Sequence, residues 1–161
     1  MTAPETNPAD ITSSINSEAG VITISASLRA APRDVFTALT DPNELAKWWG
    51  AADLYRTHQW VTDLRPGGKW STQAINADGT KSTVGGEYIE VIPPSLLEYT
   101  WSPSWDDFAV TRVRCEIEPA PSGTRLNITH TGFDPGSSGL QGTTEGWERV
   151  LTWLATWFQS R

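Results

Sequence analysis

Polar and apolar residues alternate along several stretches of the chain, with the two-residue period of strands that bury one face. The first stretch, residues 21–28, places its apolar side chains on one face: Ile22, Ile24, Ala26 and Leu28. Between about residues 54 and 132 we count six further strand-like runs, separated by segments rich in Pro, Gly, Asn and Asp. Turns this closely spaced favour an antiparallel meander.

The clearest alternation lies in residues 111–118, where charged residues alternate with Thr111, Val113, Cys115 and Ile117. In the next strand Leu126, Ile128 and His130 have the same parity. Because alternate side chains of a strand share a face, we expect His130 to point toward the apolar side of the sheet.

Three segments have helical spacing instead. One opens at Pro32, and a second follows the capping sequence Asp41-Pro42-Asn43-Glu44. After a Gly/Ser-rich loop over residues 132–142, an apolar stripe predicts a long last helix: Trp147, Val150, Leu151, Leu154 and Phe158. The order β-α-α-β6-α predicts an α+β fold in which a curved seven-stranded antiparallel sheet wraps around the C-terminal helix.

The first 19 residues are mostly Thr, Ser, Asn, Pro and acidic residues, with Ile11 and Ile15 isolated among them. Such a composition buries too little apolar surface to offset the entropy lost on ordering. We therefore expect a disordered tail over residues 1–19 and one domain over residues 20–161.

Charge and composition exclude several classes of function. The formal net charge is -7 and no two Lys or Arg residues are adjacent, so nucleic acid is not an expected partner. No apolar stretch approaches the roughly twenty residues of a membrane span. The single Cys115 and the absence of a basic start followed by an apolar run lead us to expect a cytoplasmic protein. Nine tryptophans suggest an aromatic core, pocket or interface.

Residues that bind metal or perform catalysis are sparse. His58, His130 and Cys115 are isolated in the sequence, so we predict neither a metal site nor a cofactor. Cys115 shares an apolar strand face and is interpreted as a small buried hydrophobe. His130 is the best single candidate for chemistry, but an inward-facing histidine is more often a hydrogen-bonded core residue. We assign no catalytic residue, and an enzyme is less expected than a binding module.

Several motifs of residues 21–158 resemble the SRPBCC superfamily of START-like, birch-pollen-allergen-like helix-grip domains. Within it the chain resembles the domain related to the activator of the heat-shock-protein-90 ATPase. The resemblance is carried by Pro32-x-x-Val35-Phe36-x-x-Leu39-Thr40-Asp41-Pro42, Leu45-x-x-Trp48-Trp49-Gly50, Asp63-Leu64-Arg65-Pro66-Gly67-Gly68-Lys69-Trp70, Gly86-x-Tyr88-x-Glu90-Val91-x-Pro93, Tyr99-Thr100-Trp101, Gly123-Thr124-Arg125-Leu126 with His130, and Gly146-Trp147.

The resemblance implies a helix-grip fold with a hydrophobic cavity between the sheet and the last helix. Its members include lipid carriers, hormone receptors, cyclases and chaperone regulators, so the fold does not select one function. We expect the cavity to bind a small hydrophobic or aromatic molecule, in a monomer or homodimer. The alternatives are a cyclase or hydrolase-like enzyme that uses His130, and a stress-response protein with a chaperone or other protein partner.

Aromatic residues on elements that should face each other suggest which side chains line this cavity. The expected lining residues are Trp49, Trp70, Tyr88, Trp101, Val113, Cys115, His130, Phe133, Trp147 and Leu151.

Overall fold

One antiparallel sheet organises the part of the chain that the computed structural model describes, residues 10–160. Within that part the sheet has nine strands in the order β1-β2-β9-β8-β7-β6-β5-β4-β3. The elements are β1 (Thr12–Asn16), β2 (Val21–Leu28), α1 (Pro32–Thr40), α2 (Pro42–Trp48), β3 (Gly50–Ala51), β4 (Tyr55–Thr62), β5 (Lys69–Asn76), β6 (Lys81–Ile92), β7 (Leu96–Pro103), the 3-10 turn η1 (Ser104–Asp106), β8 (Thr111–Ala120), β9 (Gly123–Thr131) and α3 (Gly139–Gln159).

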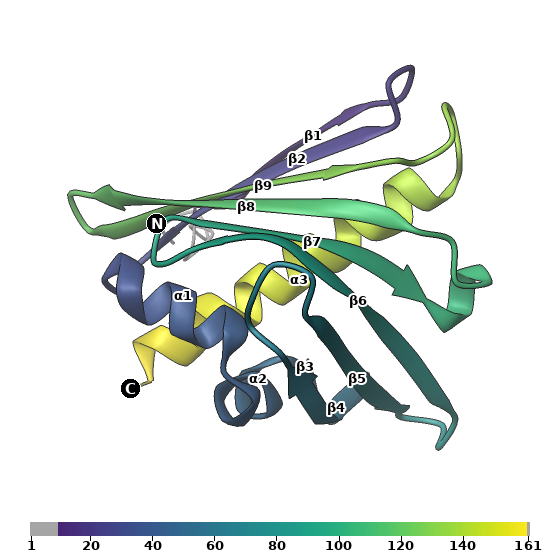
Figure 1. Ribbon diagram of the computed structural model, residues 1–161, viewed down its shortest axis with the longest axis horizontal. Coiled ribbons are helices and arrows are strands. Elements are labelled where there is room, and N and C mark those ends of the chain that lie inside the picture. Colours follow the sequence, from purple (N-terminus) through teal and green to yellow (C-terminus); the bar gives the residue numbers. More distant parts are fainter. Residues whose placement is uncertain (1–9, 161) are drawn as a thin grey trace, which may run out of the picture.

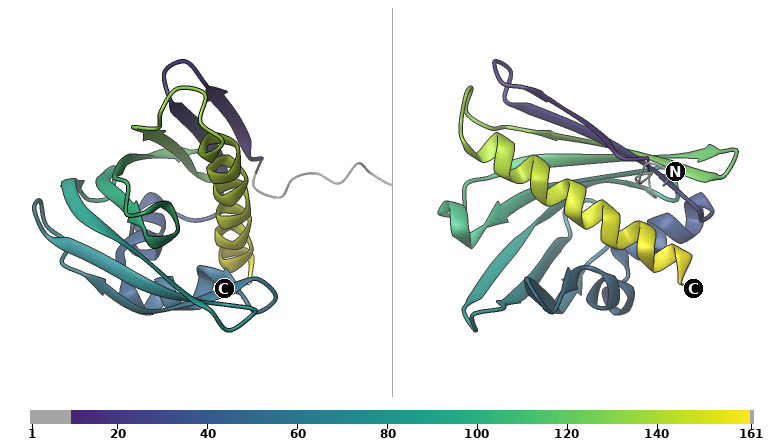
Figure 2. Two further views of the ribbon diagram at one scale, coloured as in Figure 1. Left: turned by 90° about the vertical axis from the view of Figure 1, so that its right-hand side faces the viewer. Right: turned by 180° about the vertical axis from the view of Figure 1, so that it is seen from behind.

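The sheet curves around the long helix α3, which crosses its concave side diagonally (Figures 1 and 2). Helices α1 and α2 lie beside the C-terminal half of α3, and α2 contacts it (Figure 2). A sheet that is apolar on one face must bury that face against another layer, which here is formed by α3 together with α1, packed near β8 and β9. The arrangement confirms the expected α+β class and the long C-terminal helix.

The strand periodicity proposed from the sequence is confirmed where it was clearest. In β2 the side chains of Ile22, Ile24, Ala26 and Leu28 are buried, and in β9 Leu126, Ile128 and His130 are buried. In β8 the buried residues are Thr111, Val113, Cys115 and Ile117, while Arg112, Glu116 and Glu118 are exposed. Alternation on these three neighbouring strands therefore gives the sheet one apolar face, which packs on α3.

Local signals also place the helix boundaries. The Asp41 side chain caps α2 by accepting a hydrogen bond from the backbone N–H of Asn43 at 2.8 Å. Pro32 and Pro42 stand in the first turns of α1 and α2, where a missing N–H costs nothing. Helix α3 begins at Gly139, so the loop expected over residues 132–142 is shorter than predicted.

The expected number of strands was wrong, because the structure has nine and not seven in residues 10–160. The seven predicted strands correspond to β2 and β4–β9, and the additions are the two-residue β3 and the edge strand β1. Strand β1 lies inside the segment predicted to be a disordered tail, which is a correction for residues 12–16. The remainder of the predicted tail, residues 1–9, falls outside the described residues.

Strand β1 was not predicted because its side chains are mostly exposed and its backbone pairs with β2. Its five residues pair antiparallel with β2, from Thr12 opposite Ser25 to Asn16 opposite Val21. The hydroxyl oxygens of Thr12 and Ser25 lie 3.0 Å apart, within hydrogen-bond distance. Exposed polar side chains on an edge strand also discourage pairing with another chain.

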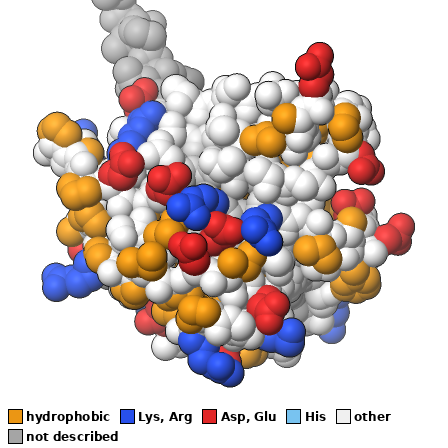
Figure 3. Space-filling view, turned by 45° about the horizontal axis from the view of Figure 1, so that its top comes forward, with side chains coloured by type: hydrophobic (Ala, Val, Ile, Leu, Met, Phe, Trp, Pro, Cys, Tyr) orange, Lys and Arg blue, Asp and Glu red, His pale blue; other side chains and the backbone are white. Residues whose placement is uncertain are grey.

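The surface of the sheet seen in Figure 3 mixes acidic and basic side chains. On β7 and β8, the carboxylate of Glu98 contacts Arg114 at 2.7 Å and Arg112 at 3.3 Å.

Within residues 10–160, none of the helices combines the length and the apolar character that crossing a bilayer requires.

Candidate functional site

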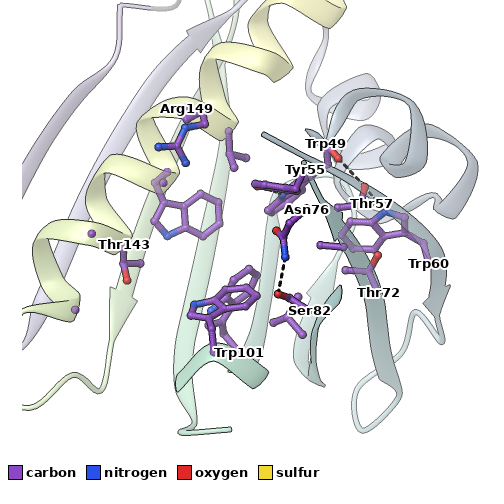
Figure 4. A pocket seen from close by; sticks show the side chains of 18 residues that line it. Trp49, Tyr55, Thr57, Trp60, Thr72, Asn76, Ser82, Trp101, Thr143 and Arg149 are labelled. Carbon is purple, nitrogen blue, oxygen red and sulfur yellow. Dashed lines mark hydrogen bonds between the residues drawn. The ribbon is translucent and has the colours of Figure 1, made fainter. Parts of the chain in front are cut away.

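A cavity of about 530 Å³ opens between α3 and the strands β4 to β7. This volume lies in the range of sites for small organic molecules, which is roughly 300 to 1,000 Å³. Five tryptophans line it: Trp49, Trp60, Trp101, Trp105 and Trp147. The cavity is thus an aromatic enclosure built from residues far apart in the sequence (Figure 4).

The aromatic wall is a connected set of rings centred on Trp49. The ring centroid of Trp49 lies 5.6 Å from that of Trp60, 6.1 Å from that of Trp147 and 6.4 Å from that of Trp101. Trp101 in turn contacts Trp105 at 6.3 Å, and Trp105 is 61% exposed. Contacts at these distances stabilise aromatic pairs, so the wall is held by its own members.

Hydrogen bonds fix the side of the wall formed by Trp49. The hydroxyl of Thr57 donates to the carbonyl oxygen of Trp49 at 2.6 Å, and the indole N–H of Trp60 donates to Thr57 Oγ1 at 2.9 Å. The indole N–H of Trp49 donates to the hydroxyl oxygen of Tyr55 at 3.2 Å. One threonine on β4 therefore positions two cavity tryptophans at once.

A second chain of hydrogen bonds fixes Trp147 and Trp101. The indole N–H of Trp147 donates to Nδ1 of His130 at 3.0 Å, and Nε2 of His130 lies 2.6 Å from Thr111 Oγ1. Because Nδ1 accepts, the proton of the neutral ring sits on Nε2 and is donated to Thr111. The Thr111 hydroxyl donates to the carbonyl oxygen of Trp101 at 3.4 Å. His130 therefore connects Trp147 of α3 to the sheet, where Thr111 continues the chain of bonds to the backbone of Trp101 on β7.

These bonds decide what the wall offers to a ligand. The N–H groups of Trp49, Trp60 and Trp147 all donate within the protein. An indole has a single donor, so these three residues present their ring faces and edges to the cavity. Ring faces favour apolar or aromatic ligands over polar ones.

The opposite wall is the first half of α3, which contributes Gly139, Gly142 and Gly146 to the lining. A Cβ atom added at Gly142 or Gly146 would meet no other atom within 4 Å. Glycine lowers helix stability by roughly 1 kcal/mol relative to alanine, so these two glycines on the cavity side of α3, one exposed and one partly buried, are unfavourable for folding alone. Their absent side chains leave the space that the cavity occupies.

The polar groups of the cavity include Thr143 and Arg149 on the helix side and Asn76 and Ser82 on the strand side (Figure 4). Thr57 and Thr72 also line it, but their hydroxyls donate to the backbone carbonyls of Trp49 and His58. The side-chain amide of Asn76 donates to Ser82 Oγ at 3.2 Å. An apolar enclosure with a small number of placed polar groups is the usual form of a small-molecule site.

Of the ten residues predicted to line a cavity, the structure brings Trp49, Trp101 and Trp147 to this one. Trp70 and Tyr88 line a separate space of about 20 Å³ with Trp49 and Trp101, which is room for about one water molecule. The other five are absent from both walls: Val113, Cys115, His130, Phe133 and Leu151.

Those five residues pack in the layer behind the wall or beside it. Val113 and Leu151 are 0% exposed, and the ring of Phe133 lies 4.7 Å from that of His130. Cys115 is 1% exposed, as its interpretation as a small buried hydrophobe expects, and burial raises the pKa of its thiol to about 12. For Val113, Cys115 and His130, strand parity identified the correct face of the sheet but not which positions along the strand border the cavity.

His130 has the properties of a structural residue. Burial lowers the pKa of its ring to about 3, so the ring is neutral at pH 7. Both ring nitrogens are engaged, by Thr111 and by Trp147. Among residues 10–160, no three His, Cys, Asp or Glu side chains gather as metal ligands would.

Sequence reasoning missed several lining residues, notably Tyr55, Trp60, Trp105 and Arg149. Trp60 follows a bulge in β4, where Gln59 has a φ of 54°, so simple alternation fails there. A usable signal was present in α3, because Gly139, Gly142 and Gly146 recur at helical spacing on one face. Three glycines on the side of a helix that borders a cavity leave space beside it.

The fold and cavity together define a START-like helix-grip domain, in which a curved sheet holds a C-terminal helix around an internal space. A family model described as "Activator of Hsp90 ATPase homolog 1-like protein" matches residues 29–159. The chain therefore belongs to this family. Among proteins with curated descriptions, no significant match was found.

Solved structures support the same classification. Protein CV1439 from Chromobacterium violaceum is 27% identical, with a TM-score of 0.76 over 86% of this chain and 97% of that one. Protein NE0264 from Nitrosomonas europaea is 26% identical, with a TM-score of 0.77 over 91% and 97%. A Rhodobacter sphaeroides protein, at 20% identity, shares the fold with a TM-score of 0.82 over 94% and 99%.

Proposed function

We propose that this protein binds a small apolar or aromatic molecule in the cavity between α3 and the strands β4 to β7. The observation that carries the proposal is the aromatic enclosure of about 530 Å³ beside the side-chain-free positions Gly142 and Gly146. A ligand that contacts ring faces on one side and bare helix backbone on the other would be flat. Burial of such a molecule is favourable at roughly 25 cal/mol per Å² of apolar surface.

The alternatives expected from the sequence have less support. A cyclase or hydrolase that uses His130 would need a free ring nitrogen, and both nitrogens are hydrogen-bonded.

A protein partner is favoured by three exposed apolar residues of one segment, Trp105, Phe108 and Val110, at 61%, 59% and 64% exposure. Trp105 also lines the cavity, so this segment borders the ligand entrance. The partner alternative is tested by comparing Phe108→Ser with the unaltered protein in sedimentation velocity. If it is right, the variant should lose the self-association or partner binding that the unaltered protein shows.

Titration with the neutral fluorescent probe N-phenyl-1-naphthylamine tests the proposal. We expect probe emission to increase saturably at a stoichiometry of one probe per chain. Excitation of the tryptophans should also transfer energy to the bound probe. The double substitution Gly142→Leu with Gly146→Leu places two side chains in the cavity. It should weaken binding by about tenfold or more, which is about 1.4 kcal/mol. Leucine favours helix more than glycine does, so the unfolding free energy should not fall.

The matched control places two leucines with the same spacing on the outer face of α3, as Thr152→Leu with Thr156→Leu. Both threonines are exposed and neither lines the cavity. This control should leave the affinity within about twofold of the unaltered protein. Equal affinity in both double variants, or no saturable binding in the unaltered protein, would contradict the proposal.

A further inference from the structure

The charge of the cavity differs in sign from that of the chain. Among the described residues that line the cavity, Arg149 is the sole charged side chain. The chain as a whole has a formal net charge of -7. A positive charge and no carboxylate at this site give an anionic group a local advantage that the rest of the surface does not provide.

The helix geometry directs Arg149 over the cavity. Gly139, Gly142, Gly146 and Arg149 follow one another at spacings of three and four residues, so they share one face of α3. Long helical side chains lean toward the N-terminus, over the preceding turn. For Arg149 that turn contains Gly146, where nothing obstructs a side chain. Figure 4 shows Arg149 on the helix side of the cavity, with Asn76 across from it.

Among the residues that the structure describes, the guanidinium of Arg149 forms no ion pair and no side-chain hydrogen bond. Glu145, one turn earlier on α3, accepts instead from the amide of Gln141 at 3.0 Å. Burial raises the pKa of the cavity residue Tyr55, and the nearby charge of Arg149 partly offsets that rise. The charge of Arg149 therefore acts on a residue that lines the cavity.

We infer that the ligand is a flat aromatic molecule that carries one acidic group, a carboxylate or a sulfonate, which pairs with Arg149. This inference rests on the proposed function and adds the charge of the ligand to it. A guanidinium presents parallel N–H donors that match the two oxygens of a carboxylate. The apolar body would lie against Trp49, Trp101 and Trp147, and the acidic group would lie at the end of the glycine stripe.

Two probes with one scaffold separate charge from apolar contact. 8-Anilino-1-naphthalenesulfonate is N-phenyl-1-naphthylamine with a sulfonate added. We expect the sulfonate probe to bind about fivefold more tightly than the neutral one, as for a partly exposed charge pair. Arg149→Gln should remove this preference and leave the neutral probe within about twofold. Added sodium chloride should weaken the sulfonate probe in the unaltered protein but not in Arg149→Gln.

The controls are Arg149→Lys, which keeps the charge and should retain most of the preference, and Arg33→Gln. Arg33 is an exposed arginine on α1 that does not line the cavity, so its loss should change neither probe. If Arg149→Gln affects both probes equally, or if Arg33→Gln has the same effect, the inference is wrong. Either result would leave the proposed function unaffected. The proposed function itself fails only if the neutral probe does not bind in the cavity.

Discussion

The indole N–H of Trp147 donates to Nδ1 of His130 at 3.0 Å, a bond that links helix α3 to strand β9 of the sheet. The bond requires a neutral imidazole, because a protonated Nδ1 could not accept it. His130 is 1% exposed and its pKa is lowered to about 3 by burial. The residue that looked most like a catalytic group is thus a support of the aromatic wall.

This relationship predicts a specific pH dependence of stability. The folded-state pKa of His130 is about 3, below its ordinary value of 6.5, so the unfolded chain binds the additional proton. The stabilisation is therefore fully present above about pH 6.5 and is lost as the pH falls toward 3. Between those limits this residue should lower the unfolding free energy by up to about 1.4 kcal/mol per pH unit.

The substitution His130→Asn isolates that contribution, because asparagine does not titrate but can still accept from Trp147. At pH 7.5 we expect a loss of about 2 to 4 kcal/mol, from the broken bond to Thr111 and the space left behind. Urea unfolding at pH 7.5, 6, 5 and 4.5 measures the unfolding free energies of both proteins. The difference in unfolding free energy between the variant and the unaltered protein should shrink steadily below about pH 6. A difference that stays constant over this range would show that His130 does not titrate on unfolding.

In the turn after β4, substitutions at the adjacent residues Gly67 and Gly68 should differ in how much they destabilise the fold. Gly67 has a φ of 84° and open space around its Cβ position, so Gly67→Val should cost about 1 to 3 kcal/mol through backbone strain. A Cβ at Gly68 would lie 1.9 Å from the carbonyl oxygen of Asp63, which the backbone must move to avoid. In denaturant unfolding Gly68→Ala should therefore be more destabilising than Gly67→Ala. Neutral behaviour of Gly68→Ala would contradict the observed turn.

The edge strand β1 predicts that part of the N-terminal segment contributes to stability. A chain that begins at Gly20 loses the pairing of β1 with β2 and the packing of Ile11 against the core. Compared with a chain that begins at Asp10, it should melt more than about 4 °C lower, on the order of 1 kcal/mol. Equal melting temperatures in calorimetry would show that β1 adds nothing to the fold.

The sequence predicted the parts of the fold that depend on burial. Alternation in β2, β8 and β9, the Asp41 cap and the apolar stripe of α3 each follow from local patterns that the structure confirms. Strand β1 could not be predicted in this way, because its stability comes from pairing with β2 and its own side chains are mostly exposed. Edge pairing depends on a partner 13 residues away in the case of Thr12 and Ser25.

The cavity was less predictable than the fold. Strand parity placed Val113 and Cys115 on the correct face of the sheet, and helical spacing placed Leu151 on the buried face of α3. The curvature of the sheet decides which buried residues meet α3 directly and which border an open space. Arg149 was missed because an arginine on a helix is ordinarily solvated. Only its position after Gly146 on the same face relates it to the cavity.

The most direct test of the account is the set of indole ¹H–¹⁵N signals of the tryptophans during titration with N-phenyl-1-naphthylamine. We expect the signals of Trp49, Trp101 and Trp147 to shift saturably at one probe per chain. Trp157 does not line the cavity and lies about 15 Å further along α3 than Trp147, so its signal should stay in place. If no signal shifts saturably, or if Trp157 shifts while Trp147 does not, the cavity is not the binding site.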